Sequence, residues 1–256
     1  MPEPLLQVEN VSVRFGGIVA LDGVSFEVAR GDIVGLIGPN GAGKTTLFNC
    51  LSRLYAFSEG RIAFEGRSIL ETPPHGIAAL GIGRTFQNLA LFRTMSVRDN
   101  VLLGGHSRTR TGYVANALRL PAVRREEERL GAAVDRLLGL LELAPVARAA
   151  VKDLPFGTQK RVELGRALAS EPKLLLLDEP AGGLNHEEVG ALMELLRRIR
   201  AELGLTMLLV EHHMNMVMRI SDRVVALDFG RKIADGTPAE VQGNADVVRA
   251  YLGVAA

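Results

Sequence analysis

The sequence is poor in cysteine and in aromatic residues. Its 256 residues include one cysteine, Cys50, no tryptophan and only 5% aromatic residues. A single cysteine cannot form an internal disulfide, which fits a reducing compartment. The formal net charge is +1, from 30 basic and 29 acidic residues. A nucleic-acid-binding protein usually shows a concentrated basic face instead, so we expect no nucleic-acid partner.

Long apolar runs are also missing. No stretch reaches the roughly 18 uninterrupted apolar residues of a membrane-spanning helix. Residues 1–4 show neither the basic start nor the apolar core of a signal peptide, so we expect no secretory leader. Hydrophobic residues at 47% and charged residues at 23% are ordinary for a globular protein of this length, with one large domain or two small ones. If the protein works at a membrane, another chain must hold it there.

A glycine-rich stretch fits the phosphate-binding loop pattern G-x-x-x-x-G-K-[ST]. It reads Gly38, Pro39, Asn40, Gly41, Ala42, Gly43, Lys44, Thr45 and Thr46. The apolar run over 32–37 predicts a buried strand before the loop, and the apolar spacing over 46–51 predicts a helix after it. These are the flanks that a phosphate-binding loop needs.

In such a loop, the glycines let successive backbone N–H groups point inward and cradle anionic oxygens. Lys44 would reach the terminal phosphates, and Thr45 would place its hydroxyl on a magnesium ion. An ordinary glycine-rich turn is the alternative, but such a turn has no need of the flanking strand and helix. The stretch predicts binding of a nucleoside triphosphate, without saying what its hydrolysis drives.

Four consecutive leucines, residues 174–177, lead into Asp178 and Glu179. Such a run predicts a parallel strand that is buried on both faces, and open α/β sheets bind ligands at the carboxyl ends of such strands. Because successive strand residues point opposite ways, the two carboxylates should have different roles. We expect Asp178 to serve the magnesium shell and Glu179 to act as general base on the attacking water. Helix capping is the structural alternative.

Other candidate site residues are ambiguous by themselves. Phe15 could stack on an adenine ring, although a lone phenylalanine is usually core. Gln87 could ligate magnesium or orient a water, or it is a surface glutamine. His212 follows a strand predicted over 206–210 and could donate to a γ-phosphate. The adjacent His213 does not make the pair a metal site, because neighbouring strand residues diverge.

A second potential phosphate site precedes a helical pattern at Leu154, Pro155, Phe156, Gly157, Thr158 and Gln159. Pro155 suits the first turn of that helix, where its missing N–H costs nothing. The exposed amides of this turn could bind an anion, with plain helix capping as the alternative.

The remaining pattern predicts the surrounding elements. Alternating residues predict strands over 5–14 and 24–28, and the Asp22-Gly23 pair predicts a turn before the second strand. These strands would form an antiparallel front sheet. A long helical stretch is expected over 113–143.

In order and spacing, these elements together resemble the ATP-binding subunit of an ABC transporter over essentially the full length. Six motifs carry the resemblance: the Walker A loop at 38–45, the Q-loop at Gln87, the signature at 154–159, Walker B at 174–178, the catalytic base at Glu179 and the switch histidine at His212. The resemblance implies ATP and Mg²⁺ as cofactors. It implies that Phe15 stacks on the adenine and that the magnesium ion is held by Thr45, Gln87 and Asp178.

The same resemblance implies an α/β fold, a P-loop NTPase core with an antiparallel β subdomain and an α-helical subdomain. Residues 1–256 would form a single ABC ATPase domain, with the helical subdomain at approximately 88–165 inserted in the core. It also implies two copies, or this chain and a paralogue, that close head to tail. Each ATP would then lie between one loop at 38–45 and the signature of the second subunit.

A closer likeness is to the ATPase of branched-chain amino acid importers. It rests on four stretches, FGGIVAL at 15–21, GRTFQN at 83–88, AGGLN at 181–185 and AYLG at 250–253. Such a subunit would lie peripherally on the cytoplasmic face of the cell membrane, with two transmembrane permease subunits and a separate extracytoplasmic solute-binding protein as partners. Urea and amide importers are similar too. An exporter of lipid or polysaccharide and a soluble ABC ATPase are the remaining alternatives.

The sequence departs from the wider family at three places. Pro155 and Phe156 replace the Ser-Gly of the signature, which removes one expected hydroxyl donor to the γ-phosphate. Asn185 stands where the D-loop usually has aspartate, and His213 stands where an aspartate often follows the switch histidine. These departures bear on signalling between subunits rather than on nucleotide binding.

Overall fold

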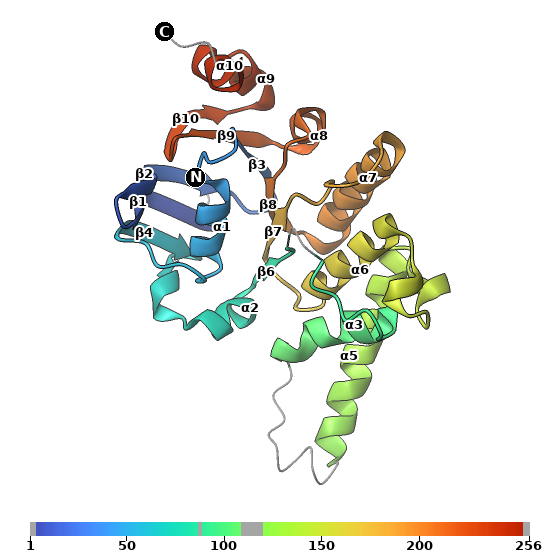
Figure 1. Cartoon of the computed structure of the whole chain (residues 1–256). Helices are drawn as coiled ribbons and strands as arrows, with labels where there is room; N and C mark the ends of the chain where they lie inside the picture. The colour runs from blue at the N-terminus through green and yellow to red at the C-terminus, as the bar shows by residue number, and fades with distance from the viewer. Residues whose placement is uncertain (1–3, 87–88, 109–119, 253–256) are drawn as a thin grey trace.

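The computed structural model describes residues 4–86, 89–108 and 120–252. Two sheets organise these residues (Figure 1). The front sheet is antiparallel, with the strand order β2-β1-β4-β5, and the central sheet has the strand order β10-β9-β3-β8-β7-β6. Pairing is parallel from β9 through β3, β8 and β7 to β6, while β10 joins β9 in antiparallel fashion.

The strands of the front sheet are β1 (Leu6–Phe15), β2 (Ile18–Val28), β4 (Glu59–Phe64) and β5 (Arg67–Ser68). Those of the central sheet are β3 (Ile33–Ile37), β6 (Ile82–Arg84), β7 (Leu174–Asp178), β8 (Thr206–Val210), β9 (Arg223–Asp228) and β10 (Arg231–Gly236). The predicted strands over 32–37, 174–177 and 206–210 are therefore confirmed, as is the antiparallel front sheet.

The α-helices are α1 (Lys44–Leu51), α2 (Ile77–Leu80), α3 (Val97–Gly104), α5 (Pro121–Leu140), α6 (Phe156–Leu168), α7 (His186–Leu203), α8 (Met214–Ile220), α9 (Pro238–Gln242) and α10 (Ala245–Leu252). Short 3₁₀ turns occur at Ile69–Glu71, Pro74–Gly76, Gly105–Arg108, Ala144–Val146 and Val151–Asp153. Within the described ranges, none of these helices combines the length and the apolarity needed to cross a bilayer.

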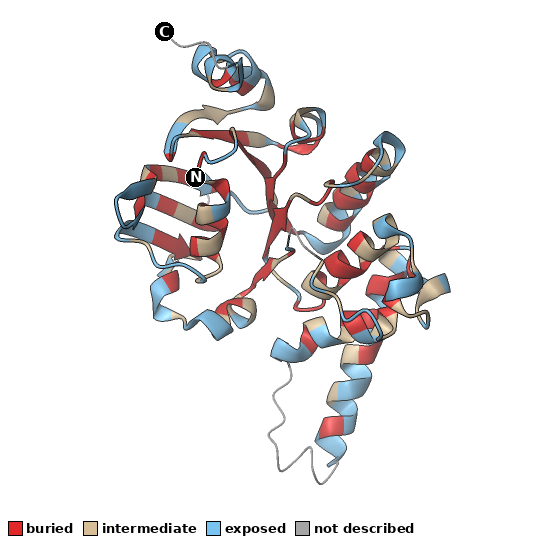
Figure 2. Cartoon of the chain, viewed as in Figure 1, coloured by how far each residue is buried: buried red, intermediate tan, exposed pale blue. Residues whose placement is uncertain are grey.

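Helix α1 lies between the front sheet and the central sheet (Figure 1). Its Leu47, Phe48 and Leu51 are fully buried in an apolar cluster that also includes residues of both sheets. The opposite face of the central sheet packs against α6, α7 and α8 in a second cluster. Figure 2 shows the result, with central strands buried along their length and the surrounding helices buried on one side only.

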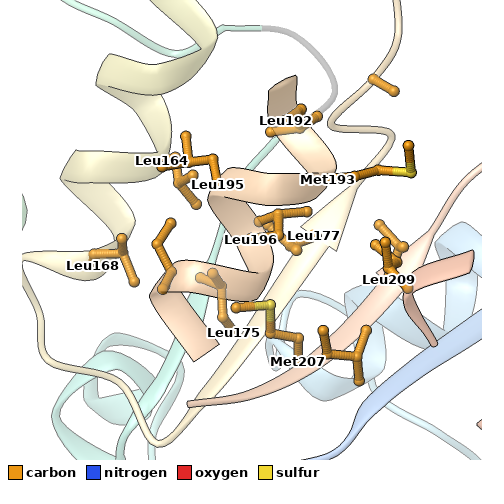
Figure 3. Packing of buried hydrophobic residues seen from close by; sticks show 14 of the residues in the cluster. Leu164, Leu168, Leu175, Leu177, Leu192, Met193, Leu195, Leu196, Met207 and Leu209 are labelled. Atoms are coloured by element: carbon orange, nitrogen blue, oxygen red, sulfur yellow. The ribbon is translucent and has the colours of Figure 1, made fainter. Parts of the chain in front are cut away.

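Strand β7 contributes to both apolar clusters. Leu174 and Leu176 belong to the cluster around α1, whereas Leu175 and Leu177 belong to the cluster around α6 and α7. Figure 3 shows Leu175 and Leu177 among leucines of those two helices. A parallel strand covered on both faces has no side open to water, which explains the unbroken leucine run and confirms the sequence prediction.

The predicted turn at Asp22-Gly23 is wrong, because both residues lie inside β2. The pairing of β1 with β2 shifts register next to this point, between Val8 and Val11 and again between Val11 and Val13. Gly23 has φ +63°, and its N–H donates to the Ser12 hydroxyl oxygen at 3.0 Å. A glycine in the left-handed region suits a β-bulge as well as a turn. The Asp22-Gly23 pair by itself could therefore not distinguish the two structures.

The helix predicted over 113–143 is also corrected. Helix α5 begins at Pro121 and ends at Leu140. Leu120 is extended, with ψ 154°, as expected for a residue that precedes proline, and Pro121 takes the first helical position. Residues 113–119 lie outside the described residues.

Truncation of a leucine between the two sheets tests this packing. Leu176→Ala should lower the free energy of unfolding by about 2–5 kcal/mol, because Leu176 is fully buried and the surrounding side chains cannot close the cavity. Leu252→Ala is the control, since Leu252 is 71% exposed and should change stability little. Urea denaturation followed by circular dichroism measures both. Equal losses in the two variants would contradict the assigned burial.

Candidate active site

The glycine-rich loop joins the end of β3 to the start of α1. Gly38 has φ +151°, and a Cβ added there would lie 2.2 Å from the Leu227 carbonyl oxygen. Gly43 has φ +101°, and a Cβ there would lie 2.7 Å from the Ala20 carbonyl oxygen. Only glycine fits at either position. Gly43 caps α1 without a side-chain hydrogen bond, so the first amides of α1 keep the donors that a phosphate group requires.

The Lys44 ammonium is buried against the same loop. Its Nζ donates to the carbonyl oxygens of Gly38 at 2.6 Å and Pro39 at 2.9 Å. Burial lowers the pKa of Lys44, and the charge of nearby Glu179 opposes that shift. On the other side of Gly38, its N–H donates to the Tyr251 hydroxyl at 2.8 Å. The C-terminal helix α10 therefore contacts the first residue of the loop, a contact that no local sequence pattern indicated.

The two carboxylates at the end of β7 have different partners. Asp178 is buried, and its Oδ2 accepts from Arg84 Nη2 at 2.8 Å. The Oε1 of Glu179 lies 2.6 Å from the Nε2 of His212. The structure thus brings together Glu179 and His212, two residues that are 33 positions apart in the chain.

Glu179 itself has φ +48°, in the left-handed region that is uncommon for residues other than glycine. Three backbone contacts hold it there. Its N–H donates to the Val210 carbonyl at 2.9 Å, and its carbonyl accepts from Gly182 N–H at 3.0 Å and from Lys160 Nζ at 3.3 Å. Neighbouring structure therefore determines where the Glu179 carboxylate points.

Glu211 is a functional candidate that the sequence did not single out. Its side chain is buried and accepts from the backbone N–H of Ala181 at 2.5 Å, of His212 at 3.0 Å and of His213 at 3.3 Å. These bonds tie the segment after β7 to the segment after β8. An acidic residue at the end of a buried strand was the available signal.

The signature stretch begins α6, but Pro155 is not in the first helical turn as predicted. Pro155 is the N-cap, with ψ 151°, and the helix begins at Phe156. The Phe156 ring is half-exposed and covers Gly183, where an added Cβ would lie 2.9 Å from the ring. Lys160 Nζ lies 5.6 Å from the ring centroid. The atypical phenylalanine is thus packed between the D-loop glycine and the lysine that contacts Glu179.

Asn185 caps helix α7. Its side-chain oxygen accepts from Glu188 N–H at 3.0 Å, and its own N–H donates to Glu188 Oε2 at 2.9 Å. Asparagine and aspartate serve equally well in this position, so the departure at Asn185 does not weaken the start of α7.

The structure also places the remaining predicted residues. Phe15 is 46% exposed and meets Tyr55 edge to face, with ring centroids 5.3 Å apart. It is therefore not a core residue and offers ring surface for stacking. Gln87 lies outside the described residues. Among the residues that are described, no cluster of three or more histidine, cysteine, aspartate or glutamate side chains could hold a metal ion alone.

Glu163 is a further buried acid that sequence reasoning missed. It lies on α6, and its Oε1 accepts from Phe86 N–H at 3.0 Å. Burial raises the pKa of Glu163, while the backbone N–H of Phe86 and the charges of Lys160 and Arg166 oppose the shift. The signature helix thus holds the residue directly before Gln87.

The raised pKa of Glu163 predicts a pH-dependent effect of Glu163→Gln. A carboxyl whose folded-state pKa lies above its unfolded value favours folding fully below the unfolded value, and this contribution is lost as the pH rises through the folded pKa. The neutral amide avoids that loss and can still accept from Phe86. Glu163→Gln should therefore gain thermal stability relative to the parent at pH 8, and the gain should shrink towards pH 4.5. A difference in melting temperature that does not vary with pH would contradict the assigned shift.

Comparisons with known proteins identify the family of this chain. Residues 21–182 match the family described as ABC transporter, and residues 231–256 match the family described as branched-chain amino acid ATP-binding cassette transporter. The chain is 41% identical to the high-affinity branched-chain amino acid transport ATP-binding protein BraF of Pseudomonas aeruginosa, with both chains covered completely. It is 44% identical to the corresponding protein LivG of Salmonella typhimurium, again over the full length of both.

A solved structure of an ATP-binding cassette from an ABC transporter, in its ADP conformation, superimposes with a TM-score of 0.85 at 32% identity. That match covers 98% of this chain and 100% of the other. The fold and the α/β class predicted from the sequence are confirmed by this likeness. The chain belongs to the family of ABC transporter ATP-binding subunits.

Proposed function

We propose that this chain is the ATP-hydrolysing subunit that energises an importer of branched-chain amino acids. The observation that carries the proposal is the full-length identity of 41–44% to relatives named for high-affinity branched-chain amino acid transport. The separate match at residues 231–256 supports the same substrate class. On this proposal residues 1–256 form one ATPase domain, and the helices within approximately 88–165 are its inserted subdomain.

Apart from Gln87, which lies outside the described residues, the candidate residues fit ATP with magnesium. Gly38 and Gly43 stand where a Cβ would clash with the backbone, and residues 38–46 would bind the phosphates through their backbone N–H groups and the Lys44 ammonium. Phe15 would stack on the adenine. Thr45, Asp178 and Gln87 would hold Mg²⁺, since hydroxyl, carboxylate and amide oxygens are the hard ligands it prefers, and phosphate oxygens complete such sites. A magnesium ion bound there would neutralise charge on the phosphates.

Glu179 would accept the proton of the attacking water as general base. Its contact with His212 would orient the carboxylate, and the imidazole would donate to the γ-phosphate. Glu211 supports that pair because it holds the backbone of His212. Each of these residues follows a strand of the central sheet, so a rigid element positions it.

The signature supports a site shared by two subunits. Helix α6, which starts at the signature, packs on the face of the central sheet opposite to α1, which starts at the loop (Figure 1). The signature at 154–159 would therefore bind the ATP held by a second copy or a paralogue. Closing and reopening of the pair would drive two permease subunits at the cytoplasmic face of the membrane, with solute delivered by a separate extracytoplasmic binding protein.

Two variants test the ATPase assignment. Glu179→Gln should keep ATP binding and lower turnover about 10²- to 10⁴-fold, because it removes the proton acceptor but preserves shape. Lys44→Ala should instead lose nucleotide affinity, because the charge that faces the phosphates is gone. Equilibrium titration with ATP and steady-state phosphate release separate the two effects. Unchanged hydrolysis in Glu179→Gln would remove Glu179 from the mechanism.

The importer assignment is tested with the intact complex. When the chain is isolated from native membranes in detergent, a pair of permease subunits should co-purify with it. The complex is then reconstituted into a membrane. Its ATPase activity should rise when the solute-binding protein is supplied with leucine, isoleucine or valine, because that protein delivers the solute. If only urea or short amides stimulate the ATPase activity, the protein belongs to a urea or amide importer instead. Co-purification with ribosomes or DNA and without permeases would overturn the transport assignment.

A further inference from the structure

Arg84 is a buried cation that no step described above uses. It ends strand β6, and its side chain is 9% exposed. Its Nη1 donates to Asn49 Oδ1 at 2.8 Å and to Ser52 Oγ at 3.0 Å, and its Nη2 donates to Asp178 Oδ2 at 2.8 Å. One guanidinium therefore joins three elements, the strand β6, the C-terminal end of the α1 region and the end of β7.

Aromatic rings hold the guanidinium in this position. Its central carbon lies 5.7 Å from the ring centroid of Phe48 on α1 and 5.1 Å from that of Phe86. A planar fork with several N–H donors can bond three partners and lie against rings at the same time, whereas the ammonium of lysine is a compact point charge. Arginine therefore suits this set of contacts better than lysine does.

This bridge spans two elements that the sheet does not join directly. Strand β8 separates β7 from β3 in the central sheet, and α1 follows β3. Strand pairing therefore does not link α1 directly to Asp178. Arg84 supplies that bond, through Asn49 and Ser52 on one side and through the Asp178 carboxylate on the other.

We propose that Arg84 is a positioning residue for the magnesium site. It fixes the Asp178 carboxylate relative to α1, and thereby relative to the Thr45 hydroxyl on the same helix. Since both Thr45 and Asp178 are oxygen ligands expected for Mg²⁺, the inference rests on the function proposed above. It adds a residue that acts on the site through Asp178 and α1.

The test measures how magnesium changes nucleotide binding, without relying on turnover. A fluorescent ATP analogue is titrated into the purified full-length chain in EDTA and then at rising magnesium concentration. In Arg84→Lys the affinity in EDTA should stay within about twofold of the parent. The magnesium concentration that half-maximally tightens binding should rise about tenfold, the loss expected when one charge-assisted hydrogen bond is weakened.

A second variant keeps the ion pair and removes its anchor. Asn49→Ala combined with Ser52→Ala leaves Arg84 paired with Asp178 but releases the guanidinium from α1, so the magnesium requirement should also rise. Circular dichroism shows whether Arg84→Lys folds. If it does not fold, the double variant alone tests whether Arg84 positions the magnesium site. Arg61→Lys is the matched control, because Arg61 is an exposed arginine of the front sheet. This variant should bind the ATP analogue as the parent does.

The possible results separate the inference from the function on which it rests. A parent chain that does not bind the analogue, or that binds it equally well after Lys44→Ala, contradicts the proposed function. If the parent binds and magnesium tightens binding, an unchanged magnesium requirement in both Arg84 and Asn49/Ser52 variants overturns the inference. A lowered requirement overturns it too, since Arg84 would then compete with the cation. If Arg84→Lys loses as much affinity in EDTA as it does with magnesium, the inference is overturned, because Arg84 then has only a general structural role.

Discussion

The parallel pairing of β7 with β8 is the constraint on which the candidate active site depends. The ladder aligns Leu174 with Thr206 and Asp178 with Val210, and Glu179 extends it through a bond to the Val210 carbonyl. Residues that follow the two strands consequently meet at one edge of the sheet, Glu179 with His212 and Ala181 with Glu211. A shift of one residue would turn every β7 side chain to the opposite face, so the apolar clusters and the site are specified by the same register.

Burial of charge at this edge also shapes the site. A charged group removed from water is costly unless it is paired or hydrogen-bonded. Asp178 has Arg84, Glu211 has three backbone N–H donors, and Lys44 has two carbonyl oxygens. Asp178 and Glu211 each have a partner from a distant segment of the chain, whereas both partners of Lys44 lie in its own loop. The bonds that offset the cost of burying Asp178 and Glu211 therefore also link β6 to β7, and the segment after β7 to the segment after β8.

Much of this could be predicted from the sequence where the signal is local. The strands at 33–37, 174–178 and 206–210 follow from short apolar runs, and the loop follows from its pattern of glycines, of which Gly38 and Gly43 leave no room for a Cβ. Two predictions failed where a local signal had two meanings: Gly23 forms a bulge instead of a turn, and α5 begins only at Pro121. Arg84, Glu163 and Glu211 were missed as partners because their contacts join residues 30 to 94 positions apart.

The sequence by itself determined which residues could bind phosphate and magnesium, because a loop of glycines, a lysine and a strand that ends in two carboxylates each carry their chemistry in adjacent positions. It also indicated the α/β class, through the resemblance of its motifs, in order and spacing, to ABC transporter ATP-binding subunits. Only the tertiary structure decided which of these residues meet. Whether Asp178 is paired with Arg84, and Glu179 with His212, depends on strand order and register, which arise from packing across the whole sheet and leave no trace in any single segment.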